Sequence, residues 1–546
     1  MAWAWRDAVR ITRIEIENWR SIKEVDFRPE QICVLVGANN AGKTNILSAI
    51  NFLLGDRWPM PANLEDGDYF QRDRARRIRI KLSLDHPIYS SVEFDTSKAT
   101  YVFNANGRDG YAVRGFNNAM REEIAFAYVD AGRSYERQFG QSRWTLFGQV
   151  LRHLHQRLRE NRDQLQQLRD ALAVAHQMLQ TDIYRTFETA LKDAFAAQLR
   201  TARYDVSFEF KTIEETNLYR GLFPTLIERG TARNPLEVGS GVRNVLVLAL
   251  FQAFAKTFRG DAVLGIEEPE LYLHPHAQRS LMRQFEQMAV EGNQIFISSH
   301  SGHFLDVSRS DRIVLVEQCE DDEEEICTQV RTASANQLVA KRQALHPARQ
   351  MSVTSMQEFI RNIRTAEMTE AFFGRVVVIV EGASEREAIP IYARSLGLDF
   401  DEHGISIVAA GGKTAIDTLA QLYQAHEIRT YVVFDNDTDN GREAVPNRTL
   451  CRMLGLPEED TPTARVTDNF AILGGNWEKQ SEQDLELISP GAYRAAEREA
   501  RAALGLAADR NKPIVARYVA NKMARAAMVP QSVSEIVGRI KAKLPA

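Results

Sequence analysis

The octapeptide GANNAGKT at residues 37 to 44 constrains the fold more than any other part of the sequence. It fits the pattern G-x-x-x-x-G-K-[ST], and it stands between the apolar run QICVLV and the helical pattern NILSAINFLL. In such a strand, loop and helix, backbone N–H groups hold phosphate, Lys43 neutralises the β and γ phosphates, and Thr44 ligates Mg²⁺. The sequence therefore predicts an α/β domain that binds a nucleoside triphosphate through Gly37, Asn39, Asn40, Ala41, Gly42, Lys43 and Thr44.

A second apolar run, AVLGIEE at residues 262 to 268, ends in two glutamates. A phosphate-binding loop needs an acid at the end of a neighbouring strand to hold the metal and polarise the attacking water. We expect Glu267 beside Mg²⁺, directly or through water, and Glu268 orienting or deprotonating that water. Asp is usual at the first position, so the division of roles between the two glutamates stays open. His300 ends the next strand, IFISSH, where its imidazole could reach the γ-phosphate.

Length and composition limit the classes of protein to which the chain can belong. Its 546 residues exceed one ordinary core, so we expect two or more domains. The sequence has no apolar run long enough to cross a membrane and no signal-peptide pattern, which favours a cytoplasmic protein with no membrane partner. A net charge of −5 argues against a uniformly basic nucleic-acid-coating protein. The four cysteines form no C-x-x-C pair, so we expect them to be reduced.

The segments IEIENWRSIKEVDF, IEEPELYLHP and ISSHS resemble those of the ABC-type ATPases of DNA repair, the RecF and SMC group. The resemblance implies ATP with Mg²⁺ or Mn²⁺, bound between two heads that each offer a signature loop to the nucleotide of the other. The candidate loop is VGSGVRNVLVLAL, with Ser240 and Gly241 facing the γ-phosphate of the partner, although it departs from the usual L-S-G-G-Q. The implied consequence is ATP-dependent dimerisation rather than fast turnover.

A second pair of strands in the sequence ends in acids. Glu381 follows the run VVVIV at residues 376 to 380, and TYVVFDNDTDNG places Asp435 and Asp437 at the tip of another strand. If these strands are adjacent and parallel, three carboxylates meet at one edge of a sheet. Carboxylates that close repel one another, and their pKa values rise unless a cation neutralises them. The sequence therefore predicts a divalent metal site.

VEGASE and FDND, with AGGK between them, resemble the Toprim domain of topoisomerases, DnaG-type primases, recombination mediators and OLD (overcoming lysogenization defect) nucleases. Toprim chemistry is metal-assisted phosphoryl transfer on nucleic acid. The sequence shows neither the nucleophilic-tyrosine domain of a topoisomerase nor the zinc module of a primase. An ABC ATPase with a helical insertion, followed by a Toprim domain, is the architecture of the OLD family, and the likeness covers nearly the whole chain.

The resemblance to the OLD family implies two Mg²⁺ or Mn²⁺ ions, with Glu381 and Asp435 shared between them, and a lysine that offsets charge on the phosphate. It extends the ligand set to Glu381, Glu385, Asp435, Asp437 and a later acid, Glu478 in preference to Glu482 or Glu486, with Lys512 preferred to Lys522 as the lysine.

The predicted fold class is α/β, with a Rossmann-like Toprim domain after the ATPase head. We expect an ABC ATPase domain in two parts, residues 1–143 and 206–330, a helical insertion at 144–205, a connector at 331–373, a Toprim domain at 374–489 and C-terminal helices at 490–546. The insertion reads as a homodimerisation arm; the alternative is a helical layer packed on its own domain.

Together these features predict an ATP-hydrolysing, metal-dependent DNA endonuclease of phage defence or DNA processing. We expect a homodimer or higher homo-oligomer, with a helicase or other defence protein as a possible partner. One alternative is an ATP-gated DNA-binding scaffold with a non-catalytic Toprim module. Another is an RNA-directed or nicking enzyme, because no base-reading motif separates DNA from RNA.

Overall fold

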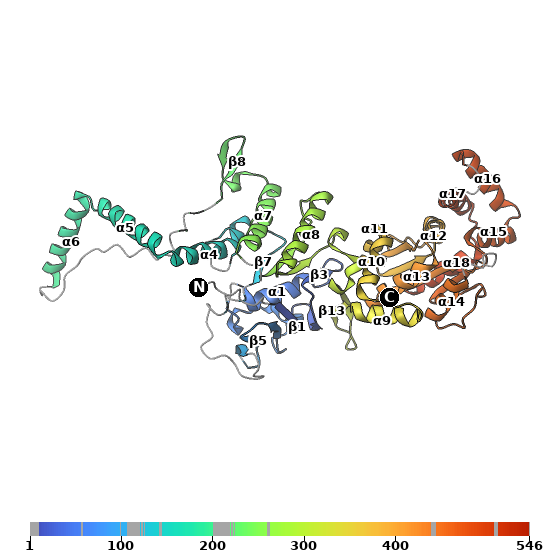
Figure 1. Cartoon of the computed structure of the whole chain (residues 1–546), viewed down its shortest axis with the longest axis horizontal. Helices are drawn as coiled ribbons and strands as arrows, with labels where there is room; N and C mark the ends of the chain where they lie inside the picture. The colour runs from blue at the N-terminus through green and yellow to red at the C-terminus, as the bar shows by residue number, and fades with distance from the viewer. Residues whose placement is uncertain are drawn as a thin grey trace.

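The computed structural model shows an elongated molecule with a helical arm at one end and the C-terminal domain at the other (Figure 1). It describes residues 10–55, 58–98, 100–105, 121, 124, 126–140, 145–199, 219, 222, 224–258, 262–437, 444–506 and 511–544. Across these residues, no helix combines the length and the hydropathy needed to cross a membrane.

The head begins with an antiparallel sheet in the order β2-β1-β4-β5-β6. Its strands are β1 (Arg10–Trp19), β2 (Ile22–Phe27), β4 (Arg79–Asp85), β5 (Tyr89–Asp95) and β6 (Thr100–Ala105). The alternation in IEIENW turns Ile14 and Ile16 of β1 into the core, and Trp19 is also buried, one residue out of phase, after Asn18 with its left-handed φ of 55°. The predicted strand pair at residues 11 to 27 is confirmed, because β1 and β2 form an antiparallel hairpin.

A second sheet carries the nucleotide-binding loop, and its order is β13-β12-β3-β11-β10-β7. Its strands are β3 (Ile32–Val36), β7 (Phe126–Val129), β10 (Val263–Glu267), β11 (Gln294–Ser298), β12 (Ile313–Glu320) and β13 (Ile326–Thr332). All pairings are parallel except that of β12 with β13. The sequence predicted that the strand with the acids lies next to β3. This prediction is wrong, because β11 lies between β3 and the acidic strand β10. The acids are therefore one strand further from the loop.

Helices cover both faces of this second sheet. α1 (Lys43–Leu54) lies between the two sheets, and its Ile46, Leu47 and Ile50 share one apolar cluster with residues of β1 and β3. α7 (Ser240–Phe258) and α8 (Pro275–Val290) cover the other face, where Phe251 and Phe285 join a separate cluster. A short helix, α3 (Tyr135–Gln138), and the hairpin of β8 (Leu226–Glu228) and β9 (Thr231–Arg233) complete the described part of the head.

The predicted helical insertion is three helices that lead away from the head (Figure 1). They are α4 (Leu146–Glu160), α5 (Arg162–Leu179) and α6 (Asp182–Leu199). Asn161 separates α4 from α5. Its side chain caps the N-terminus of α5 by accepting a hydrogen bond from the Gln164 N–H at 3.2 Å. α4 packs on α7, whereas α5 and α6 extend beyond the head.

The connector is helical and joins the two domains through a common core. Its helices are α9 (Ala335–Leu345), α10 (Val353–Ile363) and α11 (Ala366–Glu370). Leu338, Met356 and Met368 of these helices belong to one apolar cluster that runs from Ile297 in the head to Ile379 in the C-terminal domain. The head and the C-terminal domain are therefore not separate globules joined by a flexible linker.

The C-terminal domain has a sheet in the order β15-β14-β16-β18-β17, parallel except at β17. Its strands are β14 (Val376–Val380), β15 (Ile405–Ala409), β16 (Arg429–Asp435), β17 (Arg465–Val466) and β18 (Phe470–Leu473). Its helices are α12 (Ala383–Ser395), α13 (Lys413–Ala425), α14 (Ala444–Met453), α15 (Trp477–Ile488), α16 (Ala492–Leu504), α17 (Lys512–Arg525) and α18 (Gln531–Ala542). The last three helices share an apolar cluster with β14, so they belong to this domain.

Two oppositely charged sequence runs meet on the head. The acidic run 320–325 forms the turn between β12 and β13, and Lys23 lies 2.5 Å from Asp321 and 3.0 Å from Glu325. Arg76, from the basic run 72–81, also contacts Glu325 at 2.5 Å. Asp321 and Glu325 of this turn are thus paired with the chain's own cations.

Candidate active sites

The nucleotide-binding loop connects β3 to α1, and two of its glycines are required by the fold. Gly37 and Gly42 have φ values of 153° and 111°. A Cβ on Gly37 would lie 1.9 Å from the Val316 carbonyl oxygen, and a Cβ on Gly42 would lie 2.2 Å from the Thr328 hydroxyl. The pattern G-x-x-x-x-G is therefore fixed here by close approach of β12 and β13 as well as by backbone conformation.

Lys43 points back into this loop. Its ammonium donates to the carbonyl oxygens of Gly37 at 2.9 Å and Ala38 at 2.8 Å. Burial lowers the pKa of Lys43 to about 8, and the nearby Glu268 and Glu270 oppose that shift. Of the other predicted loop ligands, Asn39, Asn40 and Thr44 are exposed and Ala41 is buried.

The acids after β10 lie within electrostatic range of Lys43. Glu267 is 4% exposed and accepts a hydrogen bond from the Ala131 N–H at 3.1 Å. Glu268 has a left-handed φ of 42°, and its carboxylate lies 3.9 Å from Nε2 of His300. Burial, with a smaller contribution from Lys43, holds the pKa of His300 below its ordinary value. His300 is therefore neutral near pH 7 and can donate or accept one hydrogen bond.

Two residues that the sequence argument missed hold this region in place. Arg133, which is 2% exposed, donates to the carbonyl oxygens of Glu267 at 3.3 Å, Leu271 at 3.1 Å and Glu268. It therefore fixes the backbone that carries both acids. No local pattern around Arg133 indicates this role, because its partners lie more than a hundred residues further along the chain.

Glu270 is the second missed residue. It accepts hydrogen bonds from the backbone N–H of His300 at 2.6 Å and from the Ser299 hydroxyl at 2.9 Å. It thereby joins the end of β11 to the loop after β10. The signal was present in the sequence, since Glu270 is the third acid of EEPE.

The predicted signature residues lie at the start of α7. Ser240 is exposed, and a Cβ on Gly241 would meet nothing within 4 Å. Val242 and Val245, on the following turn, are 51% and 48% exposed. A loop that serves the nucleotide of another subunit must be accessible, and these residues are.

In the C-terminal domain, Glu381 and Asp435 come together at the ends of adjacent parallel strands. β14 pairs with β16 in a register that sets Val380 opposite Val433. The backbone N–H of Asp435 donates to the Glu381 carboxylate at 3.2 Å. The carboxylate of Asp435 accepts a hydrogen bond from the Trp477 N–H at 3.3 Å. Burial raises the pKa of Asp435 well above its ordinary value, and the carboxylates nearby raise it further.

Glu385 enters the same cluster from the first turn of α12. It is 3% exposed, and burial raises its pKa to about 7, with Glu381 and Glu478 adding to the shift. Glu381 and Glu478 therefore each lie within electrostatic range of Glu385. The cluster is therefore costly to ionise without a cation.

Asp437 is held beside Lys413, for which the sequence alone indicated no role. Asp437 has a φ of 48°, and its N–H donates to the Gly475 carbonyl oxygen at 2.9 Å. Its carboxylate accepts from the ammonium of Lys413, which also lies 4.0 Å from the Glu381 carboxylate. Lys413 belongs to the AGGK turn, which is the signal that could have identified it.

The structure separates the candidates for the late acid and the lysine. Glu478 accepts from the Ser384 hydroxyl at 3.2 Å and lies 3.6 Å from the ammonium of Lys512. The other three candidates have partners elsewhere: Glu482 pairs with Arg494, Glu486 accepts from the Gly491 N–H, and Lys522 pairs with Glu499. Glu478 and Lys512 therefore lie at the cluster, while Glu482 and Lys522 serve local ion pairs between helices.

The donor sets of both regions suit divalent metal ions. Buried carboxylate oxygens nearly always have a partner. Within the described residues, however, Oδ1 of Asp435 and Oε1 of Glu267 are buried with none. An oxygen-ligating cation such as Mg²⁺ would satisfy each of them.

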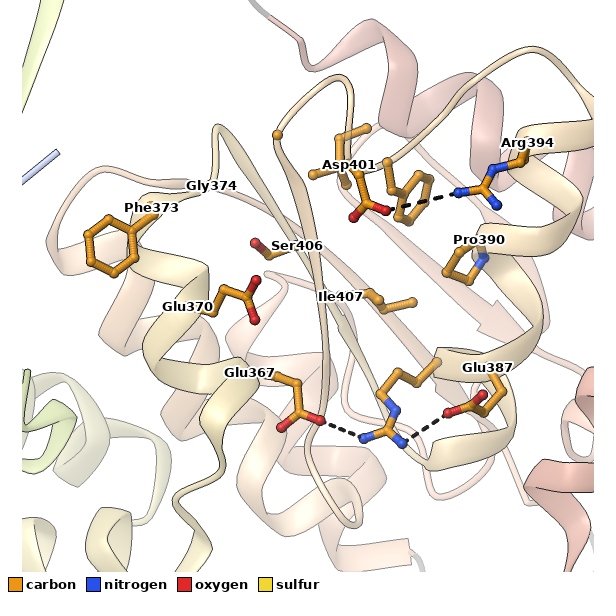
Figure 2. A pocket seen from close by; sticks show the side chains of 14 residues that line it. Glu367, Glu370, Phe373, Gly374, Glu387, Pro390, Arg394, Asp401, Ser406 and Ile407 are labelled. Carbon is orange, nitrogen blue, oxygen red and sulfur yellow. Dashed lines mark hydrogen bonds and ion pairs between the residues drawn. The ribbon is translucent and has the colours of Figure 1, made fainter. Parts of the chain in front are cut away.

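A separate pocket of about 510 Å³ lies along the edge strand β15 (Figure 2). Several of its carboxylates face arginines: Arg386 donates to Glu367 at 2.9 Å and to Glu387 at 3.0 Å. Arg394 lies 3.9 Å from Asp401. Because these acids are paired within the pocket, it is distinct from the clustered acids at the ends of β14 and β16.

Fold and site together define an ATPase head of the phosphate-binding-loop class joined to a Toprim domain. The family model described as "AAA domain, putative AbiEii toxin, Type IV TA system" matches residues 32–306, half of the chain, and a model of the OLD-like (overcoming lysogenization defect protein-like) TOPRIM domain matches residues 372–437. The chain belongs to the family of the first model, and its residues 372–437 are similar to the OLD-like TOPRIM domain.

Three curated relatives are similar over most of the chain. An OLD nuclease of Thermus scotoductus is 26% identical, covering 78% of this chain and 82% of that protein. The Old nuclease of Escherichia phage P2 is 22% identical, covering 79% and 77%. Endonuclease GajA of Bacillus cereus is 22% identical, covering 85% and 82%.

Proposed function

We propose that this protein hydrolyses ATP and cleaves DNA with divalent metal ions, in defence against phage or in DNA processing. The observation that carries the proposal is the meeting of Glu381, Glu385 and Asp435 at one sheet edge, with a buried oxygen of Asp435 that has no hydrogen-bond partner among the described residues. The names of the three relatives, all nucleases, favour the same activity.

In this proposal the residues at the sheet edge hold two metal ions and the scissile phosphate. Glu381, Glu385, Asp435, Asp437 and Glu478 would hold these ions, with Glu381 and Asp435 as the ligands that both ions would share. When bound, Mg²⁺ or Mn²⁺ supplies an activated water and charge stabilisation at the leaving oxygen. Lys512, half exposed beside Glu478, is placed to meet a phosphate from the solvent side.

The head would bind ATP on the loop of residues 37–44, with Lys43 and Thr44 toward the phosphates and the metal. Glu267, whose Oε1 is buried with no hydrogen-bond partner in the described part of the chain, is the better candidate for the metal side. Glu268 and His300 are side by side, so Glu268 can position the attacking water while neutral His300 contacts the γ-phosphate. Ser240 and Gly241 would complete the site of a second subunit.

The arm supports a homo-oligomer. Apolar side chains on α5 and α6 are unusually exposed for a folded chain: Val174, Met178, Leu179, Ile183 and Phe187 range from 52% to 81%. A helical layer on its own domain would have covered them. We infer that a second copy of the arm does so.

A plasmid assay tests the proposed activity. Supercoiled DNA is incubated with protein and Mg²⁺, Mn²⁺ or EDTA, with and without ATP, beside Asp435→Asn, Lys43→Ala and the surface control Asp468→Asn. Asp468 is a suitable control because its side chain is 79% exposed and pairs only with Arg539 among the contacts described. Metal-dependent cleavage that is lost in Asp435→Asn and kept in Asp468→Asn supports the nuclease.

The same assay separates the other candidates. Intact ATPase activity with no cleavage under any condition would favour an ATP-gated DNA-binding scaffold. Cleavage of an RNA substrate in place of DNA would reassign the substrate, and products that stop at the nicked circle would define a nicking enzyme.

A further inference from the structure

Lys413 is a buried cation that the fold places among the acids Glu381, Glu385, Asp435 and Asp437, called here the acid cluster. It is the first residue of α13, and its side chain is fully buried. Its ammonium donates to the Asp437 carboxylate and lies 4.0 Å from the Glu381 carboxylate. Lys512, by contrast, is 52% exposed and approaches Glu478. The two lysines therefore contact different acids, and only Lys413 is enclosed.

The position of Lys413 is unfavourable apart from its acidic partners. A cation in the first turn of a helix opposes the helix dipole, and a buried ammonium loses its hydration. The carboxylates of Asp437 and Glu381 offset both costs. A residue kept at such a position has a role that depends on its charge rather than on packing.

The backbone around Lys413 leaves its ammonium little freedom to move elsewhere. Gly411 and Gly412 have φ values of 74° and 131°, which turn the chain sharply before α13. The N–H of Gly412 donates to the carbonyl oxygen of Glu381 at 3.0 Å. The turn that carries the lysine is thus bound to the strand end that carries the acid.

We propose that Lys413 competes with metal ions for the carboxylates of Asp437 and Glu381 and so sets the metal concentration that the nuclease requires. The proposal rests on the proposed nuclease function and concerns the regulation of that site. An ammonium and a divalent cation cannot bind the same carboxylate oxygens without repelling each other. A metal ion that binds here must therefore displace the ammonium from Asp437 or bind with a positive charge close by. Either effect lowers the affinity of the site for the metal ion.

Metal binding to nucleotide-free protein tests this competition. Mn²⁺ affinity is measured by calorimetry for the parent chain, Lys413→Met, Lys413→Arg and the control Lys341→Met, which removes an exposed lysine on α9. We expect Lys413→Met to bind Mn²⁺ at least about tenfold more tightly, because one nearby positive charge is removed. Lys413→Arg and Lys341→Met should stay near the parent value.

The outcomes separate this proposal from the proposed function. Suppose that Lys413→Met binds Mn²⁺ no more tightly than the parent, while Asp435→Asn loses the binding that the parent shows. This result would overturn the proposed competition but would still support the metal site. No Mn²⁺ binding by the parent or by Lys413→Met would overturn both. If Lys413→Met does not fold, Lys413→Gln, which keeps a donor for Asp437 without the charge, carries the same expectation.

Discussion

The backbone N–H of Asp435 donates to the carboxylate of Glu381 over 3.2 Å, which joins the ends of two neighbouring parallel strands. The contact holds the two acids at a fixed separation at the ends of buried strands, so the proposed metal ligands would be organised before a metal ion binds. Its cost is electrostatic, since burial and nearby carboxylates raise the pKa of Asp435. That cost leads to the first prediction.

Asp435→Asn should abolish metal-dependent cleavage and yet stabilise the protein in EDTA at pH 8. The amide removes a buried charge, and its NH₂ supplies a donor to the acids around it, so we expect roughly 1 kcal/mol of added stability. Thermal denaturation in EDTA measures this, with Asp468→Asn as the control. A lower Tm for Asp435→Asn than for Asp468→Asn would contradict the account of a repulsive cluster.

The nuclease should gain metal affinity as the pH rises from 6 to 8. Burial raises the pKa of Glu385 from 4.5 to about 7, so the folded chain holds a proton that the unfolded chain releases. Between those two values the free energy of unfolding therefore falls as the pH rises in EDTA, because the folded state binds more protons. A metal must displace the same proton, so its binding strengthens through the same window.

The measurement for Glu385 is the rise in Tm caused by Mn²⁺ at pH 6 and at pH 8. We expect the larger rise at pH 8, and Glu385→Gln should remove most of the difference. An equal rise at both pH values in the parent chain would show that Glu385 does not control the site.

Arg133→Met should lower the rate of ATP hydrolysis by about tenfold or more while changing ATP affinity little. The Arg133 guanidinium donates to carbonyl oxygens of Glu267, Glu268 and Leu271, which shape the loop that carries the acids; among the described residues it has no hydrogen bond to the loop of residues 37–44. ATPase assays and nucleotide titration on the variant separate kcat from binding. Arg137→Met, which alters a half-exposed neighbour paired with Asp130, is the matched control. Equal kcat values in the two variants would remove Arg133 from the ATPase site.

Met178→Asp combined with Ile183→Asp should shift the protein to a smaller species in solution. These side chains are 77% and 81% exposed on α5 and α6, and a charge buried at an interface there would be unpaired. Sedimentation velocity compares the variant with Val290→Asp, an 82% exposed position on α8. If both variants sediment like the parent, the arm is not the contact between subunits.

The sequence was sufficient to predict the main strands and to predict that Glu381 and Asp435 lie at one edge of a sheet. Five consecutive branched residues before Glu381 predicted a buried strand, and that strand is β14. The pairing of Glu381 with Asp435 followed from the rule that parallel strands end at one edge. The break of the insertion at Asn161 was missed, because helical periodicity continues through it and only the capping side chain ends the helix.

Residues that act through distant partners could not be predicted in this way. Arg133 acts through carbonyl oxygens, which leave no trace in sequence patterns. Lys413 is local to AGGK, yet its role depends on the position of Asp437, which the fold alone brings near. The order of β3, β11 and β10 was likewise out of reach, since the sequence gives no direct sign that β11 inserts between the other two.

The apolar cluster shared by the head, α9 to α11 and the Toprim sheet limits how this protein can be divided. A fragment that begins at residue 374 would present to water the surface that Met356, Met368 and Phe372 normally cover. Chimeras with related proteins should therefore exchange the Toprim domain together with the connector helices, cutting near residue 333 rather than near 373. Substitutions on one side of this junction should require compensating substitutions on the other, because each half forms part of the interior of the other.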